Sequence, residues 1–407
     1  MIRAASLALI LAVGGALAAG AETRIRADVG GSYVDPDATS LQAGMGFNQM
    51  TDLSGGLRIM TDGAQDDLRY ALHLNLAYQQ GDSVALAGLL PAGAVPPASL
   101  LDLTQNVGVG SRGQMAAQID RAWVSYTTDR AVVKLGRQAI TWGNGLVFHP
   151  GDIVAPFSPN ALDTSHKPGV EMVYGQYLFD SGADVQAIYV PRPAVAGSAV
   201  DPDSSTIALR GFSNFGPVDA SVLWAQDRGD RALAVGLSGA LGGAGWKAEV
   251  VDWQLATGAV DPSWVVNITN FGSLGDWGLS YFAEVYHNGF GTTPGTPVDV
   301  LPAALAKRMA TGQVFYGGTD YVALGAQLLI SPEFSLAPSA IISATDGSKM
   351  LTLAGNLNLG DNSDLSFAAF APIGADGSDF GGRETSAGSG TYLGAAPGVS
   401  VKFTQYF

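Results

Sequence analysis

The chain has 407 residues, 47% of them hydrophobic, with 54 glycines, no cysteine and a formal net charge of −15 at pH 7. The lack of cysteine excludes a disulfide framework and thiolate chemistry, and the acidic balance argues against a nucleic-acid partner. Mean hydropathy is +0.19, yet beyond the N-terminal segment no apolar run approaches the ~20 residues of a membrane-spanning helix, so the apolar residues are dispersed along the chain.

The N-terminal segment has the layout of a secretory signal peptide. Arg3 supplies a positive charge, Ala4–Ala18 is apolar, and small residues precede the polar Glu22. The apolar run is shorter than a membrane-spanning helix requires. We therefore expect Met1–Ala21 to be a signal peptide, cleaved after Ala21 or alternatively after Ala18, and residues 22–407 to form the exported protein.

The segments that follow predict strands. Glu22–Ser40 fits a strand, a periplasmic tail or a small plug equally well, whereas Leu41–Met50 and Gly55–Thr61 show partial alternation that favours two strands. In Tyr70–Tyr78, apolar residues alternate with polar or small ones, and an aromatic residue stands at each end. Such a strand shows one face to lipid and the other to a lumen, with aromatic residues at both membrane interfaces.

The segment Leu135–Glu171 does not read as an ordinary strand pair. It contains Trp142, Phe148, Phe157 and four prolines. An exposed mobile loop has no need of buried aromatic side chains, and proline stiffens a loop. We therefore expect residues 141–168 to form an ordered loop that folds into the mouth of a barrel and narrows its pore.

Two strand segments break the alternation. Simple alternation places Arg137 on the lipid side, so either Gly136 marks a bulge that turns it inward or Arg137 lies at the membrane rim. We expect the bulge, because an arginine facing lipid at the bilayer midplane costs about 2–4 kcal/mol. In Lys247–Gln254, charged and apolar side chains share one face, which predicts a bulge or a change of register there.

The same region carries a family resemblance. Gly136-Arg137-Gln138, Trp142-Gly143, Pro150-Gly151-Asp152 and Pro156-Phe157 together resemble the "GRQ…WG…P-x-D…PF" block of the alginate-export-like group of large outer-membrane barrels and related proteobacterial barrels. The similarity covers about Gly136–Gly169, less than a tenth of the chain. It implies a single-chain barrel that passes solutes. The resemblance does not extend to the transported substrate, because the expected lumen residues include no basic run of the kind that would bind an anionic polysaccharide.

Alternation returns in Trp277–Val285, Leu351–Leu357 and Val399–Phe407, and a period of two repeated this often is not typical of a helical protein. The last segment ends on an aromatic residue and resembles the closing strand of Gram-negative outer-membrane barrels. The resemblance implies outer-membrane lipid and lipopolysaccharide as surroundings, and the barrel-assembly machinery as a partner that receives the strand ending at Phe407.

The connections also alternate in length. Short turns are expected near Thr128–Arg130, Asp180–Gly182, Asn214–Pro217, Gly242–Gly245, Gly272–Asp276, Ser331–Pro332 and Gly360–Asn362. Long connections are expected near Gly81–Gly113, Thr141–Pro168, Pro191–Ser204, Gly289–Gly318 and Ala371–Pro397, all on the other side of the alternation. The sequence therefore predicts an all-β protein: a single transmembrane antiparallel β-barrel of about 18 strands, alternatively about 16, with short periplasmic turns and long extracellular loops.

Candidate pore-lining and constriction residues are inward-facing polar side chains and residues of the long loop: His73, Arg121, Lys134, Arg137, Gln138, Trp142, Asp152, Arg210, Glu249, Glu284 and Lys402. They would either orient solutes as a charged ladder or pair with one another to hold the barrel in shape.

The loop's His and Asp residues match no zinc or calcium spacing, and no G-x-S-x-G motif marks a nucleophile. We expect no metal, no cofactor and no enzymatic activity.

These features predict a Gram-negative outer-membrane porin that lets small hydrophilic solutes pass by passive or weakly selective diffusion. One alternative is a plugged barrel that transports apolar compounds, with Glu22–Asp67 as the plug. Another is a structural sleeve around a periplasmic partner protein. The acidic composition is compatible with a lumen that favours cations, and the sequence leaves open the solute and the choice between a monomer and a homo-oligomer such as a trimer.

Overall fold

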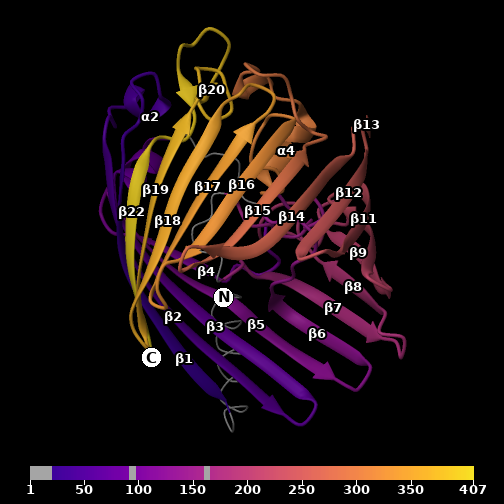
Figure 1. The fold of residues 1–407 in the computed structure, drawn as a ribbon. Coiled ribbons are helices and arrows are strands. Elements are labelled where there is room, and N and C mark those ends of the chain that lie inside the picture. The colour runs from indigo at the N-terminus through magenta and orange to yellow at the C-terminus, as the bar shows by residue number, and fades with distance from the viewer. Residues whose placement is uncertain (1–20, 91–97, 160–165) are drawn as a thin grey trace.

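The structure is a computed structural model that describes residues 21–90, 98–159 and 166–407. Apart from Ala21, the expected signal peptide lies outside these residues. Eighteen antiparallel strands close into one barrel (Figure 1). In chain order they are β1 (Glu22–Val34), β2 (Met50–Gln65), β3 (Leu68–Gly81), β5 (Gly113–Thr127), β6 (Ala131–Gln138), β7 (Val170–Leu178), β8 (Asp184–Val190), β9 (Thr206–Phe215), β10 (Val218–Asp227), β11 (Asp230–Leu241), β12 (Ala244–Leu255), β14 (Ser263–Leu274), β15 (Trp277–His287), β16 (Asp320–Leu329), β17 (Phe334–Ser343), β18 (Lys349–Gly360), β19 (Ser363–Ile373) and β22 (Gly398–Tyr406).

The remaining elements lie in the connections. Short strands β4 (Thr104–Gly108) and β13 (Gly258–Ala259) pair with β5 and β12, and β20 (Arg383–Glu384) pairs with β21 (Tyr392–Leu393). The helices are α2 (Leu41–Gly44), α3 (Asp82–Leu89), α4 (Ala303–Ala310) and a 3₁₀ turn at Val298–Val300. In the described part of the chain, none of the helices has the length and apolarity that a membrane crossing would need.

The first and last strands close the barrel. β1 pairs antiparallel with both β2 and β22, and Ile25 exchanges two backbone hydrogen bonds with Phe407, at 3.1 and 2.8 Å. Of the three readings left open for residues 22–40, the strand is what the structure contains, over Glu22–Val34. A plug formed by Glu22–Asp67 is therefore wrong, because β1 and β2 are both part of the wall.

The strand count of 18 is confirmed, but one of its expected members is not a strand. Leu41–Gly44 is a helical turn, and the Ser40 hydroxyl caps it by accepting a hydrogen bond from the Ala43 backbone nitrogen at 3.1 Å. Serine at this position satisfies a backbone donor that a strand would have paired with its neighbour. The two strands that precede β3 are instead β1 and β2.

The outward-facing side chains form an apolar belt. Val133 and Leu135 on β6, for example, are 54% and 55% exposed, and the belt continues on the strands around the barrel. Exposed apolar area of this extent is what a barrel wall presents to lipid. Alternation along the strands therefore sorts side chains to the two faces as the sequence predicted.

The expected irregularity in Lys247–Gln254 is not present. β12 pairs with β11 and with β14 without a register shift. Val251 and Trp253 face inward with Glu249 and are 0% and 3% exposed. Apolar residues are tolerated on the lumen side there because segments folded into the barrel cover them, as described below.

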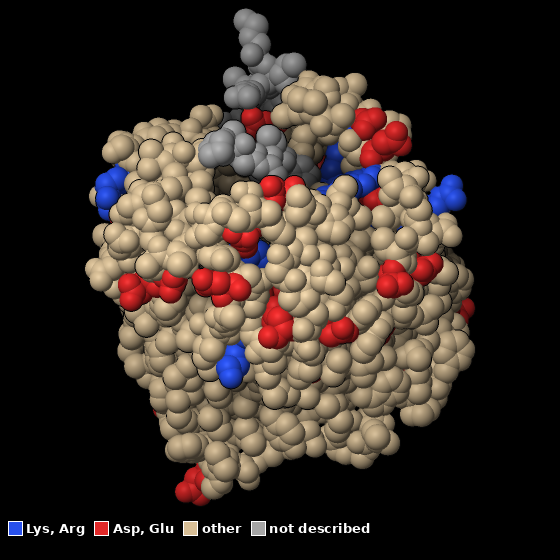
Figure 2. Space-filling view, turned by 90° about the horizontal axis from the view of Figure 1, so that it is seen from above, with Lys and Arg blue, Asp and Glu red and all other residues tan. Residues whose placement is uncertain are grey.

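The long connections all lie at one end of the barrel, as predicted, and the connections at the other end are all short turns. The C-terminus and the start of β1 lie at the end with the short turns, and α4 and the β20–β21 ribbon lie at the other, the loop end (Figure 1). Seen onto the loop end, Asp and Glu side chains are more frequent than Lys and Arg (Figure 2). Part of the net negative charge thus lies at the mouth.

Candidate functional site: a lumen narrowed by an inserted loop

Between β6 and β7 the chain leaves the wall and enters the barrel. We call residues 139–169 the inserted loop; its residues 160–165 lie outside the described part of the chain. Trp142, Phe148 and Ile153 are 4%, 6% and 1% exposed, because they pack against inward-facing residues of β7–β16. The loop is therefore an ordered part of the interior, as its aromatic and proline content predicted.

Two wall carboxylates hold the tip of the inserted loop. Glu284 on β15 accepts hydrogen bonds from the backbone nitrogens of Leu146, Val147 and Phe148, at 2.6, 3.0 and 2.8 Å. Glu284 is 1% exposed, and Asn267 on β14 donates a further bond to it at 3.1 Å. A buried carboxylate is stable only when hydrogen bonds replace its hydration, and here the loop backbone supplies them.

Glu249 on β12 does the same for the neighbouring part of the loop. Its two oxygens accept from the backbone nitrogens of Asn144, at 3.0 Å, and Gly151, at 2.7 Å. A Cβ atom at position 151 would lie 2.5 Å from the Glu249 carboxylate, so glycine is needed for this approach. Asn144 also bonds through its side chain to the carbonyl of Ala248, at 3.1 Å. The loop tip is thus fixed to two strands by carboxylate-to-backbone contacts.

Aromatic packing also holds the tip of the inserted loop against the wall. Phe148 stacks on Tyr286 of β15 with ring centroids 4.4 Å apart, and it lies 5.4 Å from the ring of Tyr321 on β16. At the start of the loop, the Trp142 indole nitrogen donates to Gln186 of β8 at 2.7 Å. The loop therefore spans the inner side of the wall from β8 to β16.

The base of the loop is held by charged residues. Lys167 pairs with Asp152 and donates to the carbonyl of Ile140 at 2.5 Å. Burial raises the pKa of Asp152 and lowers the pKa of Lys167, in each case against the attraction of the other group. Both charged groups are thus removed from water, and each is stabilised in its charged form by contact with the other.

A bulge in β5 brings a further anchor to the loop base. The β3–β5 pairing shifts between the His73–Arg121 and Leu74–Ile119 pairs, which leaves Asp120 as the extra residue. Asp120 accepts hydrogen bonds from Arg121 at 2.8 Å and from the Gly169 backbone nitrogen at 3.2 Å. It also pairs with Arg58 of β2, while Arg121 donates to the Lys167 carbonyl.

Arg137 lies where β6 leaves the wall, and the expected mechanism for its position is wrong. The β5–β6 register continues through Arg137, so Gly136 inserts no extra residue. Gly136 instead adopts a φ of +121°, and a Cβ there would lie 2.1 Å from the Ala122 carbonyl oxygen. Arg137 is 4% exposed and bonds to Glu171 at 2.7 Å and to the Ile119 carbonyl at 3.0 Å.

A second segment fills the mouth beside the inserted loop. Arg308 of α4 is 1% exposed, lies 3.8 Å from the ring centroid of Trp253, and pairs with Asp227 and Asp230 at 3.2 and 2.7 Å. Gln313 joins this segment to the inserted loop by donating to the Ile153 carbonyl at 2.7 Å. One side of the lumen near the loop end is therefore packed.

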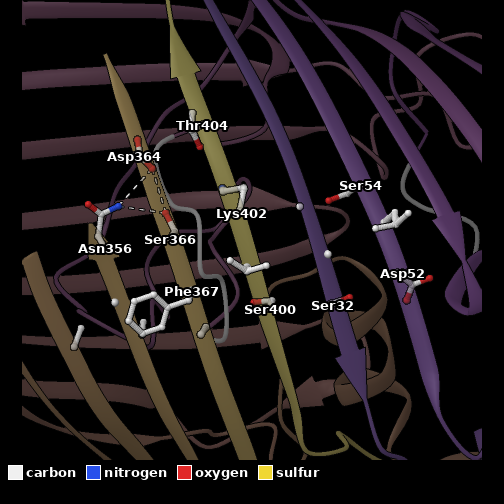
Figure 3. A pocket seen from close by; sticks show the side chains of 18 of the residues that line it. Ser32, Asp52, Ser54, Asn356, Asp364, Ser366, Phe367, Ser400, Lys402 and Thr404 are labelled. Atoms are coloured by element: carbon white, nitrogen blue, oxygen red, sulfur yellow. Dashed lines mark hydrogen bonds between the residues drawn. The ribbon is translucent and has the colours of Figure 1, made fainter. Parts of the chain in front are cut away.

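The other side of the lumen holds an open cavity of about 520 Å³, lined by inward-facing residues of β1–β3, β16–β19 and β22. Most of its side chains are hydroxyls, amides or small residues (Figure 3). Four charged residues line it, two of each sign: Arg26, Asp52, Asp364 and Lys402. Asp364 bonds to Ser366 and Asn356 at 3.3 and 3.5 Å. The structure thus combines a loop fixed inside the barrel with an open cavity lined by other strands.

The sequence-predicted site residues divide between these regions. Trp142 and Asp152 belong to the inserted loop, and Arg121, Glu249 and Glu284 bond to it. Arg137 and Gln138, at the end of β6, bond to Glu171 and Met172 of β7. Of the predicted set, Lys402 lines the open cavity. His73 bonds to Asp62 at 3.1 Å, Lys134 lies 4.3 Å from the ring centroid of Trp123, and Arg210 lies 5.9 Å from that of Phe212.

Sequence reasoning missed Asp120, Arg58 and Asn267. Asp120 reaches the loop only because of the β5 bulge, for which the sequence gives no signal. Arg58 and Asn267 alternate correctly with outward apolar neighbours and could have been added on that ground. Within the described residues, His, Asp and Glu nowhere gather in a set of three or more that could hold a metal ion.

Comparison with known proteins bears on the fold. No protein-family model matches the chain, and neither does any curated protein sequence. Among solved structures, Wzi, an outer-membrane protein involved in group 1 capsule assembly in Escherichia coli and described as a carbohydrate-binding β-barrel, matches with a TM-score of 0.53 and 9% identity, over 97% of this chain and 86% of its own.

Two further solved structures are similar. OccK5 (OpdH) of Pseudomonas aeruginosa has a TM-score of 0.53 and 10% identity, over 95% of this chain and 98% of its own. A BenF-like porin from Pseudomonas fluorescens Pf-5 has a TM-score of 0.52 and 9% identity, over 96% and 99%. At these identities the likeness shows the fold alone. The chain has the fold of a porin-type outer-membrane barrel.

Proposed function

We propose that the protein is a Gram-negative outer-membrane channel through which small hydrophilic solutes diffuse passively, beside a loop that narrows the lumen. The observation that carries this proposal is the open cavity of about 520 Å³ on the inner side of β1–β3, β16–β19 and β22, whose lining is mostly hydroxyl, amide or small residues and includes no residue of the inserted loop. Barrels of about 16–18 strands are wide enough to leave an aqueous channel when side chains and loops do not fill them.

The location is supported by the wall and by the comparisons. The apolar outward belt suits lipid, and the similar solved structures include an outer-membrane protein and a porin. The N-terminal segment, read as a cleaved signal peptide, fits export to that membrane. Recognition of the strand ending at Phe407 by the barrel-assembly machinery, a setting among lipopolysaccharide, and the oligomeric state stay predictions.

The charges of the lumen support weak rather than strong ion selectivity. Negative groups are frequent at the loop end, but the cavity itself carries Arg26 and Lys402 against Asp52 and Asp364. Glu249 and Glu284, which would otherwise attract cations, have their oxygens engaged by the inserted loop. The net charge of −15 therefore overstates the cation preference of the passage.

The test is single-channel recording of the detergent-purified protein in a planar lipid bilayer, with a salt gradient. Discrete current steps and a small reversal potential are expected. A protein that heat-modifiable gel mobility shows to be folded, yet that carries no current, would overturn the proposal. The sleeve alternative would then come first, and co-purification of a periplasmic protein would test it.

Transport of apolar compounds has less support. Apolar side chains on the lumen side, such as Val251 and Trp253, are covered by the inserted loop and the α4 segment rather than lining the cavity. No observation on the wall favours an exit toward lipid.

A further inference from the structure

One row of side chains crosses the cavity wall in direct register. The paired residues on six successive strands, from β18 through β19, β22, β1 and β2 to β3, are Asn356, Ser366, Lys402, Gly30, Ser54 and Gln79. All six line the cavity, and Figure 3 shows the labelled members on neighbouring strands. We call them the hydroxyl–amide row.

The chemistry of the row is neutral hydrogen bonding. Serine hydroxyls and Asn or Gln amides each both donate and accept, whereas Lys402 is the one charged member. Gly30 leaves a gap, and a Cβ there would lie 2.9 Å from the Val401 carbonyl oxygen. A second pair of hydroxyls, Ser32 and Ser400, lies directly opposite one another beside the row.

The two carboxylates that line the cavity, Asp52 and Asp364, are already engaged. Asp52 accepts from the backbone nitrogen and the hydroxyl of Ser83, at 2.9 and 2.5 Å. Asp364 bonds to Ser366 of the row itself. A cation passing along the row would compete with these bonds, and an anion would meet one cationic member of the row, Lys402, with Arg26 as the second cationic residue of the cavity. A neutral solute rich in hydroxyls could exchange bonds with every side chain of the row.

The tilt of the strands places the side chains of the row one after another along the pore axis. Neighbouring strands are about 4.8 Å apart, and strands of such barrels tilt by about 35–45°, so a row perpendicular to the strands climbs along the barrel axis. Neutral hydrogen bonds are individually weak, so a solute can make and release them one after another. Conduction requires binding of this kind, spread over several sites.

We propose that the hydroxyl–amide row is the solute track of the channel and selects neutral polyhydroxylated solutes, sugars and sugar alcohols, over ions of the same size. This assignment rests on the proposed function, because it presumes an open channel. The solute class follows from the side chains of the row and from the engaged state of the nearby carboxylates.

The test is swelling of liposomes that contain the folded protein, with mannitol, gluconate and protonated glucosamine as probes of similar size. Mannitol should enter several-fold faster than either ion. Replacing Ser54, Ser366 and Asn356 together by alanine should slow mannitol by about five-fold or more, while salt conductance changes by less than two-fold. Ser238→Ala, on the inner face of β11 outside the row, should leave mannitol entry unchanged.

Each outcome separates the two proposals. Equal entry of the three probes, or an alanine variant that keeps the mannitol preference, would overturn the track while the channel itself stands. No entry of any probe, together with no salt current, would overturn the channel. Gel mobility of each variant shows that it is folded, so a silent variant is distinguished from an unfolded one.

Discussion

Glu284 accepts a hydrogen bond from the backbone nitrogen of Phe148 at 2.8 Å, although 136 positions separate the two residues in sequence. Two residues further along β15, Tyr286 stacks on the ring of the same Phe148. One strand therefore holds both the backbone and the side chain of the loop tip. Both contacts therefore fix the position of the loop tip against β15.

Glu284→Gln should loosen the inserted loop. A glutamine amide keeps one acceptor and places an NH₂ group against backbone donors, so at least one of the three loop hydrogen bonds is lost and the others are weakened by the loss of the charge. Hydrogen bonds to a charged group contribute about 1.5–3 kcal/mol each. Single-channel recording should show current fluctuations and a changed mean conductance.

The matched control is Asp252→Asn, which removes a carboxylate from the outward face of β12. It should conduct like the wild type. Wild-type conductance and noise in Glu284→Gln would show that the loop does not depend on this carboxylate.

Glu249 and Glu284 should act on one loop and therefore not additively. If either replacement by Gln already frees the tip, the double variant adds less than the sum of the two single effects. The quantity to compare is the change in open-channel noise across the four members of the double-mutant cycle. Strict additivity would mean that the two carboxylates hold independent segments.

Gly136→Ala should impair folding or insertion of the barrel. Its φ of +121° disfavours a side chain, and the added Cβ would clash with the Ala122 carbonyl. Gly175→Ala, on neighbouring β7 with no heavy atom within 4 Å of the added Cβ, is the control. Heat-modifiable gel mobility should show folded Gly175→Ala protein and a markedly smaller folded fraction for Gly136→Ala. Equal folded fractions would contradict the strain argument.

Protonation of His149 at acidic pH should weaken the binding of the inserted loop to the barrel wall. Burial, with repulsion from Lys167 and Lys247, lowers the pKa of His149 from 6.5 to about 4. Between these values a released loop binds more protons than a seated one, so the free energy of seating falls as pH falls, by at most about 3 kcal/mol. The current noise of the wild type should therefore increasingly exceed that of His149→Gln as the pH falls from 6.5 to 4, since only the wild type carries the His149 contribution. An unchanged pH profile in the variant would contradict this.

Sequence alternation was sufficient for the wall but not for the contents of the lumen. It predicted the strand count and the faces of residues such as Leu135, because a lipid-facing wall imposes a strict period of two. It wrongly predicted an irregularity around Trp253, because an apolar residue on the lumen face breaks the expected alternation. Packing of other segments against Trp253 inside the barrel explains its place on that face. Proline and aromatic content did predict that the inserted loop is ordered.

The partners within the site could not be read from the sequence. Glu249 and Glu284 were expected to line a pore, but they bind loop backbone, and no sequence pattern encodes which amides will face a carboxylate. Asp120 escaped notice because a bulge moved it out of its alternating place. The hydroxyl–amide row depends on strand register, which joins residues as distant as Ser54 and Ser366.

The most direct test of an open polar passage beside the seated loop uses the natural lack of cysteine. Ser400→Cys and Ser366→Cys each place one thiol in the cavity, whereas Val399→Cys places one on the outward face, where Val399 is 52% exposed. A charged, membrane-impermeant thiosulfonate should reduce the single-channel current of the two cavity variants and leave Val399→Cys unaffected. Folded cavity variants that stay unmodified from both sides of the bilayer would contradict the account.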